Sequence, residues 1–577
     1  MPIHKKAAAR QKGAKSGYDL KHKESLLRYL SNSAKSTLHI LAEPYSLALL
    51  FIMALAIFLS FSFFYGPSPI NGCDNYLYTD FGYYLSIGNL WRVAEWGVLA
   101  QQYILDVGIA FFFKILGPSR FSASLFGELC FLLNIFVLYK MGSLLYNRKA
   151  GVFAAFFYSF IPVAVINSVY VGDNGPMALF ATLCVYFLAK AIKNKGKQRR
   201  NNYLLSGFFG LINLLVTSEG IIILIVPAIV LLAYLIKDRN LDSIKDAFYF
   251  ALGVLAAFAI IAFIGFALFF KPLYIFSLNF HIYSSSVSPQ PSFSRYVLYL
   301  FPFNVAQNFN NLILLLHNEG IGPAYNYLRN WLFNASTFDY QAGQGQIIGL
   351  IGYATVLAVL YLFVRRNLSF WLPALWLVST MLYLGYGTVS LTKYIPIGYN
   401  NVRFMLLFVP SLALIVGIAA ADIVDFGKDR AKHARQPNLI KAARYLLIFL
   451  LVATTLVLFI NSVLAIRFIS LSEYSWIYNL IVIGKYVENL PSNATIYSNY
   501  PIAEYARFSR TFYMLPLNCS QITKGSYVVL NYNETYASKC NLVPVFQPKV
   551  PNYLLKYNLF ANNSWGTFFN TTVYYRN

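Results

Sequence analysis

Apolar runs of about 20 residues repeat along most of the chain and are separated by short polar or basic segments. Each run is long enough to cross a hydrocarbon layer of about 30 Å as a helix, and a helix satisfies its own backbone hydrogen bonds in lipid. The pattern therefore predicts a polytopic helical membrane protein. The predicted spans, about eleven in number, are 46–65, 122–145, 151–167, 176–191, 203–216, 220–236, 247–270, 346–364, 369–385, 402–423 and 445–466.

The pattern changes after residue 469, where Asn, Ser, Thr and Tyr become frequent. The runs ATIYSNY, SYVVLNY and FFNTTVYYR are typical of strands, and residues 475–490 of a helix. The predicted fold class is thus an all-α polytopic membrane protein with a small C-terminal extracytoplasmic α/β domain. We predict a basic tail at 1–45, a membrane domain at 46–469 and the α/β domain at 470–577.

Charge sets the expected orientation of these segments. The 577 residues carry a formal charge of +24, but the basic residues lie in short runs between the apolar segments. This is the positive-inside pattern, so it indicates topology and not a nucleic-acid partner. The basic amino-terminal tail is expected to be cytoplasmic. The long loops 66–121 and 271–345 and the C-terminal domain are expected on the opposite face of the cell membrane.

The cysteines and the glycosylation sequons give weaker signals. No cysteine pair has the spacing of a zinc site, whereas Cys519 and Cys540 could form a disulfide if the tail is extracytoplasmic. Asn-x-Ser/Thr sequons cluster in the tail, and an Asn-rich composition could produce them by chance. They lie at Asn493, Asn518, Asn533, Asn562 and Asn570, with Asn334 in the large outer loop.

Two acidic residues are the first candidates for chemistry. Asp80 lies in the loop NGCDNYLYTDFGYYLSIGN after the first span, and Asp173 lies in the short loop YVGDNG between two later spans. Carboxylates that converge at a membrane surface can bind a divalent cation such as Mg or Mn, or one can take the proton of a hydroxyl nucleophile. The alternative for Asp173 is that it only caps the helix that begins near Pro176.

Five further residues are candidates for substrate binding. Asp106 lies in a segment predicted to be an interfacial helix, and Glu219 at the end of a span; each could instead form a structural ion pair or a cap. The cations suit a phosphate group, although Arg403 could instead reach lipid headgroups. These cations are Arg295, Lys393 and Arg403.

Four stretches resemble the type C membrane glycosyltransferases, which use sugars linked to polyprenyl phosphate. TDFGYYLSIGNL resembles the acidic motif of the first outer loop and NSVYVGDNGPMALF that of the second. QYILDVGIAFFFKILG resembles the stretch after the first motif, and VRFMLLFVP resembles the segment near the donor phosphate. Ser286-Val287-Ser288 resembles a stretch of the oligosaccharyltransferase catalytic subunit, but the WWD motif of that enzyme is missing from this sequence.

The resemblance implies an enzyme that transfers a sugar from a polyprenyl-phosphate donor to a protein or glycolipid acceptor on the outer face. Asp80 and Asp173 would be catalytic, with a divalent cation shared between them, and Arg403 with Lys393 or Arg295 would bind the phosphate. The alternatives are an oligosaccharyltransferase-like enzyme and, from another class, a lipid or solute transporter. Transporters tend to show paired repeats and broken helices near the midplane, whereas the acidic candidates here lie at one surface.

Overall fold

The structure is a computed structural model, and it describes 15 stretches of the chain. These are residues 43–62, 73–89, 103–238, 241–269, 313–314, 316–318, 320–323, 326, 350–386, 402–426, 437–498, 509, 512–531, 534–555 and 571–577. The chain divides into two compact units, residues 1–52 and 53–577. Of the first unit, the structure describes residues 43–52, which include the beginning of the helix α2 (Pro44–Ser62).

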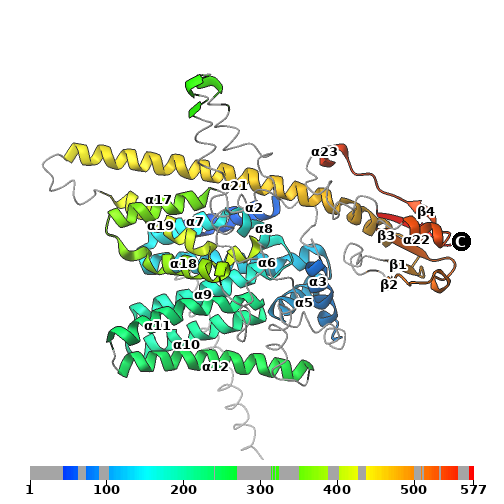
Figure 1. Cartoon of the computed structure of the whole chain (residues 1–577), viewed down its shortest axis with the longest axis horizontal. Coiled ribbons are helices and arrows are strands. Elements are labelled where there is room, and N and C mark those ends of the chain that lie inside the picture. The colour runs from blue at the N-terminus through cyan, green and yellow to red at the C-terminus, as the bar shows by residue number, and fades with distance from the viewer. Residues whose placement is uncertain are drawn as a thin grey trace, which may run out of the picture. The chain divides into compact units, whose positions relative to one another are not determined.

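The described chain is mostly helical (Figure 1). Its longer helices are α2 (Pro44–Ser62), α3 (Cys73–Ser86), α5 (Tyr103–Leu116), α6 (Arg120–Leu145), α7 (Arg148–Ser159), α8 (Pro162–Val169), α9 (Asn174–Lys193), α10 (Gly196–Ile212), α11 (Ile225–Asp238), α12 (Leu241–Phe269), α17 (Ile351–Val364), α18 (Trp371–Tyr386), α19 (Val409–Asp425) and α21 (Pro437–Glu488). The 3₁₀ segments η2 (Asn213–Leu215), η3 (Ser218–Leu224), η6 (Leu368–Phe370) and η7 (Val402–Leu407) interrupt them.

Each predicted span overlaps one of these helices. Among the described residues, 7 helices are long and apolar enough to cross a membrane, or 8 if the bent pair α7 and α8 is one span. That pair bends by 66°, because Pro162 lacks a backbone N–H and disfavours helical geometry in the residue before it. The predicted total of about eleven spans stays a prediction.

Close helix contacts in the membrane domain depend on glycine. α10 packs against both α9 and α12 (Figure 1). A Cβ on Gly207 of α10 would come within 2.3 Å of the Phe250 carbonyl oxygen, and one on Gly253 of α12 within 1.9 Å of the Leu204 carbonyl oxygen. Small residues at such crossings let two backbones approach, which is the main route to helix association in lipid.

Among the described helices, α19 is enclosed along most of its length. All residues from Val409 to Asp422 are buried, and α19 contacts α7, α17, α18 and α21. The indole N–H of Trp376 on α18 donates to the carbonyl oxygen of Leu407, 2.8 Å away, at the entry to this helix. The apolar sequence of α19 therefore forms core and not a lipid-facing surface.

A polar cluster closes the far end of α19. The carboxylate of Asp422 accepts hydrogen bonds from the hydroxyl groups of Tyr146 at 2.9 Å and Tyr361 at 2.8 Å. It also accepts from Arg365 and Asn367, each at 3.2 Å. One buried carboxylate thus ties the turns after α6 and α17 to the end of α19.

The tail forms a five-stranded sheet in the order β2-β1-β3-β5-β4. Its strands are β1 (Ile496–Ser498), β2 (Phe512–Met514), β3 (Tyr527–Asn531), β4 (Val543–Phe546) and β5 (Thr571–Tyr575). β1 pairs in parallel with β2 and β3, while β5 is antiparallel to β3 and β4. The predicted strand runs became β1, β3 and β5; the short edge strands β2 and β4 were not predicted.

The two faces of this sheet carry different apolar clusters, because successive side chains on a strand point to opposite faces. Val529 of β3 packs with Ile483 and Val487 at the end of α21. Val528 and Leu530 of the same strand pack in the other cluster, beside α22 (Glu534–Lys539). The expected α/β character of the tail is confirmed.

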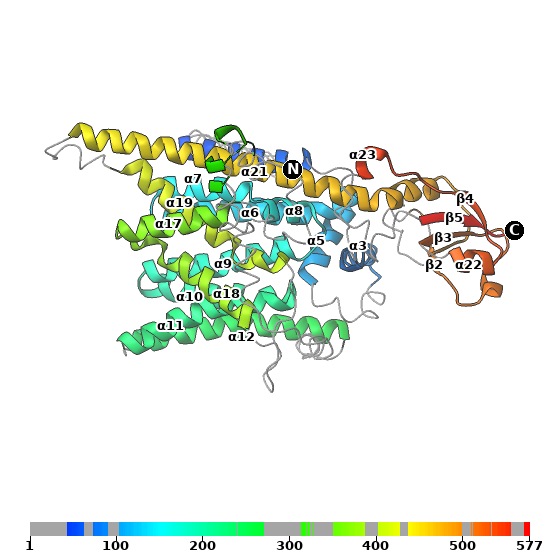
Figure 2. The same cartoon turned by 45° about the horizontal axis from the view of Figure 1, so that its top comes forward.

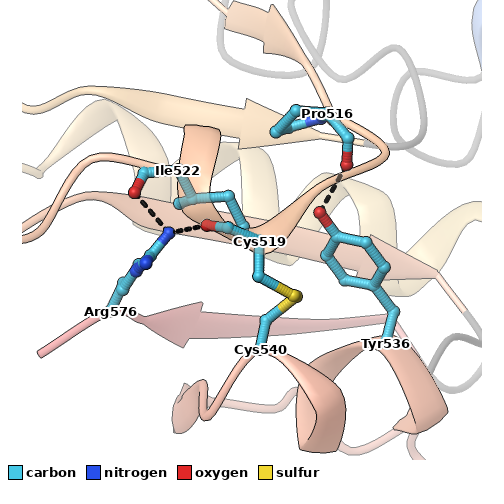
Figure 3. Close-up of a disulfide and its surroundings, with 6 residues drawn as sticks. All are labelled: Pro516, Cys519, Ile522, Tyr536, Cys540 and Arg576. Atoms are coloured by element: carbon cyan, nitrogen blue, oxygen red, sulfur yellow. Dashed lines mark hydrogen bonds between the residues drawn. A yellow bond between two sulfur atoms is a disulfide. The ribbon is translucent and has the colours of Figure 1, made fainter.

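The disulfide between Cys519 and Cys540 is present on the α22 side (Figure 3). Arg576 donates to the carbonyl oxygens of Cys519 and Ile522, and Tyr536 donates to the carbonyl oxygen of Pro516. These contacts join the end of the chain and the 516–522 segment to the disulfide.

The predicted last span and the predicted tail helix are one continuous helix, α21, of 52 residues. At a rise of about 1.5 Å per residue it extends far beyond a hydrocarbon layer. The predicted domain boundary at 469/470 falls inside α21, so no loop marks it. The division into domains stays a prediction.

We expect Asp422→Leu to lower the free energy of unfolding by about 3 kcal/mol, because four donors would lose their shared acceptor. Thermal unfolding of the full chain in detergent measures this effect. Asp242→Asn is the matched control: Asp242 pairs with Arg200 but its side chain is 74% exposed, and exposed pairs contribute little. Equal changes in the two variants would contradict the proposed role of the Asp422 cluster.

Candidate active site

The segment that carries Asp80 is helical and not the loop expected from its polar composition. It forms α3, which packs against α5 (Figures 1 and 2). Tyr78 and Phe81 on α3 are buried against Leu105 and Ile109 on α5. The burial of these side chains explains why a polar stretch is ordered as a helix. Asp80, which lies between Tyr78 and Phe81 in the sequence, is half-buried.

The same apolar cluster extends to two other elements. Ala123 at the start of α6 and Val171 in the turn before α9 belong to it. Val171 lies two residues before Asp173. The cluster therefore holds together three segments that carry acidic candidates: α3 with Asp80, α5 with Asp106, and the turn with Asp173.

Asp173 is the N-cap residue of α9 and only 2% exposed. Its side chain makes no capping hydrogen bond, although its backbone carbonyl accepts from Met177 N–H at 2.9 Å. Neighbouring amides fix the turn, because Asn174 donates to Asn167 Oδ1 at 2.8 Å and Asn167 donates to the Val163 carbonyl. The expected position at a helix start is confirmed, while the capping contact that would explain the residue structurally is not made.

Asp106 lies in the first turn of α5 and is fully buried. Neither of its carboxylate oxygens has a hydrogen-bond partner among the residues that the structure describes. Burial raises the pKa of Asp106 well above the usual value of an aspartate. Burial, and secondly the nearby Asp106, raises the pKa of Tyr103. The expected helix is confirmed, and the alternatives of an ion pair or a cap have no support in the described chain.

Glu219 lies on η3, and the side chain of Asn213 contacts this segment through a hydrogen bond. Asn213 is fully buried, and its amide donates to the carbonyl oxygens of Met177 and Gly220, each at 3.3 Å. Met177 is in the first turn of α9, so this one side chain links the segment of Glu219 to the helix that begins at Asp173.

Arg403 lies on η7, and η7 packs against α8, α9 and η3. The segment of this predicted phosphate ligand therefore contacts the helix that begins after Asp173 and the segment that carries Glu219. The two other predicted cations, Arg295 and Lys393, lie outside the described residues.

Polar residues that were not predicted lie within the apolar helices near this site. Glu128 on α6 is 4% exposed and lies beside Ser60 and Ser168, whose hydroxyl oxygens are 2.9 Å apart. Asn213 is a second example. Both could have been identified in the sequence as polar side chains within apolar runs. Such side chains are costly in a membrane, so they often mark functional positions.

Among the described residues, no three His, Cys, Asp or Glu side chains lie close enough together to hold a metal ion.

Residues 105–266, from α5 to α12, match the family model described as dolichyl-phosphate-mannose-protein mannosyltransferase. The fold matches that of ArnT from Cupriavidus metallidurans, crystallised with undecaprenyl phosphate, with a TM-score of 0.54 at 12% identity; the match covers 91% of this chain and 97% of that one. The resemblance to type C membrane glycosyltransferases is confirmed. The family match also supports the predicted enzyme class, a glycosyltransferase, over a transporter.

Two structures of the Archaeoglobus fulgidus oligosaccharyltransferase are more distant. The complex with Zn and sulfate has a TM-score of 0.45 at 13% identity, covering 84% of this chain and 68% of that one. The AglB complex with an inhibitory peptide and a dolichol-phosphate has a TM-score of 0.45 at 12% identity, covering 84% and 69%. No curated protein sequence matches the chain.

We expect Asp106→Asn to make stability less dependent on pH. The unfolded chain ionises this group near its usual pKa of about 3.9, whereas the folded chain keeps the proton to higher pH. The contribution of this group to the free energy of unfolding is thus fully present below about pH 4 and is lost as the pH rises toward the folded pKa. The asparagine variant should melt at a higher temperature than the wild type at pH 8 and at a similar one at pH 4.

Thermal melts of both proteins in detergent across this pH range measure the difference. A constant difference in melting temperature at every pH would contradict a buried, neutral Asp106.

Proposed function

We propose that this protein transfers a sugar from a polyprenyl-phosphate carrier to a protein or glycolipid acceptor on the extracytoplasmic face of the membrane. The observation that carries the proposal is the apolar cluster that joins α3, α5 and the turn before α9. It brings the segments of Asp80, Asp106 and Asp173 together. The shared fold of ArnT, whose structure contains undecaprenyl phosphate, supports a lipid-phosphate donor.

The chemistry of such a donor fits the residues available. A sugar on a lipid phosphate already has a good leaving group at neutral pH, so the site needs no strong general acid. It needs a base for the acceptor and cations for the departing phosphate. In our proposal Asp80 takes the acceptor proton, and Asp173 is the second carboxylate of the site.

The phosphate is proposed to bind Arg403, together with Lys393 or Arg295. Support comes from the contact of η7, which carries Arg403, with the helix α9 that follows Asp173 and with the segment η3 that carries Glu219. A guanidinium group makes two parallel hydrogen bonds to phosphate oxygens, which fixes the orientation of the departing group. Asp106 and Glu219 are proposed to border the substrate.

A divalent cation such as Mg or Mn, bound by Asp80 and Asp173, remains part of the proposal. Carboxylate oxygens are the ligands that these cations prefer, and a bound cation would neutralise charge on the departing phosphate. The steps assigned to Asp80 and Arg403 do not depend on it.

The orientation of the site is supported by the disulfide between Cys519 and Cys540. Disulfides persist in oxidising compartments and are rare in the cytosol. The C-terminal domain is therefore proposed to be extracytoplasmic, in agreement with the basic amino-terminal tail being cytoplasmic.

We expect Asp80→Asn to lower the transfer rate about 10²- to 10⁴-fold, because an amide cannot take the acceptor proton. Mass spectrometry of lipid-linked sugars measures this in cells lacking the protein and complemented with each variant. One polyprenyl-phosphate sugar should accumulate without the protein and with Asp80→Asn, at equal expression. Asp74→Asn, on the same helix, is the matched control and should restore the wild-type pool. Full restoration by Asp80→Asn would refute the assignment of the base.

We expect Arg403→Ala to raise the KM for the lipid-linked donor about 10- to 100-fold, as loss of a charge-assisted contact predicts. Initial rates of the purified full chain, measured against donor concentration, give this value. Arg467→Ala, which changes an exposed arginine on α21, should leave KM unchanged. An unaltered KM in Arg403→Ala would indicate that Arg403 contacts lipid headgroups instead.

A further inference from the structure

Two sequons of the C-terminal domain are presented on its surface. Asn493, in Asn493-Ala494-Thr495, lies in the turn between α21 and β1 and is exposed. Asn518, in Asn518-Cys519-Ser520, is exposed between β2 and the 3₁₀ turn η8 (Cys519–Gln521). Both belong to the described part of the chain, and the structure shows the surroundings of each.

We propose that Asn493 and Asn518 are sites of asparagine-linked glycosylation. The inference rests on the extracytoplasmic orientation proposed above for this domain. The amide nitrogen of each asparagine would attack the anomeric carbon of a sugar held on a lipid phosphate. The C–N bond forms as the C–O bond to phosphate breaks, the phosphate leaves with the electron pair, and the amide nitrogen gives up one proton to a base of the transferase.

The geometry at Asn518 suits an acceptor. Its backbone is extended, with φ −104° and ψ 128°, and its side chain makes no capping hydrogen bond to the turn that follows. The preceding residues Met514 and Leu517 are 89% and 92% exposed. Asn518 thus lies in a segment with several exposed side chains, and the disulfide at Cys519 holds the residue that follows it (Figure 3).

The geometry at Asn493 is similar in the respects that matter for access. The turn is closed by a backbone hydrogen bond from Ala494 N–H to the Pro491 carbonyl oxygen at 3.0 Å. The sequon ends where the sheet begins, because Tyr527 N–H donates to the carbonyl oxygen of Thr495 at 2.9 Å. Backbone hydrogen bonds of neighbouring residues therefore hold this turn, and the Asn493 side chain is exposed at the surface.

Another sequon, Asn367-Leu368-Ser369, lies outside the tail and provides an internal contrast. The Asn367 amide donates to the buried carboxylate of Asp422 at 3.2 Å, and its Oδ1 accepts from Ser369 N–H at 3.1 Å. It also follows Arg365 and Arg366 on the face predicted to be cytoplasmic. Both its contacts and its side of the membrane exclude it as an acceptor.

The test is glycopeptide mass spectrometry of the full chain purified from the membranes of its own cells. We expect the peptides containing Asn493 and Asn518 to carry sugar mass, and the peptide containing Asn367 to carry none. Thr495→Ala and Ser520→Ala should each remove the sugar from one site while leaving its asparagine in place. Thr495→Ser should retain it.

Asn489→Gln is the matched control, because Asn489 is an exposed asparagine four residues before Asn493 and lies outside any sequon. It should leave both modifications unchanged. Unmodified peptides at both Asn493 and Asn518, or sugar on Asn367, would overturn the proposal. Neither readout depends on the activity of this chain, so this failure is distinguishable from failure of the proposed transferase function.

Discussion

The docking of α3 and α5 against the start of α6 and the turn at Val171 is the contact on which the candidate site depends. Burial of an aromatic or large aliphatic side chain contributes about 1.5–3 kcal/mol. Several such side chains hold α3 and α5 against the start of α6 and the turn before α9. Without this packing, Asp80 would lie on a polar segment with no fixed relation to Asp173.

The surrounding polar residues are held by few but specific contacts. Asn213 joins α9 to η3, and Asn174 with Asn167 holds the turn of Asp173. At the far end of α19, Asp422 joins the turn after α6 to α17 and the turn after it. Because lipid offers no competing hydrogen bonds, such buried polar contacts fix geometry at particular points of an otherwise apolar assembly.

The continuous helix α21 connects the apolar helices to the C-terminal sheet. Its last turns supply Leu480, Ile483 and Val487 to the core of the C-terminal domain. A helix that is shared by both parts leaves no flexible linker at the predicted boundary.

The sequence determined the membrane class, the positions of the long apolar helices and the α/β tail, because hydrophobic periodicity and charge runs are local properties. It also indicated Asp80, Asp173 and the pair Cys519 and Cys540, through short motifs and spacing. Tertiary structure decided what local patterns cannot contain. The helix at Asp80 depends on partners about 25 residues or more away in sequence, and the complete burial of Asp106 depends on the elements packed around α5. The enclosure of α19 likewise reflects its neighbours, since an apolar helix reads the same whether it faces lipid or protein.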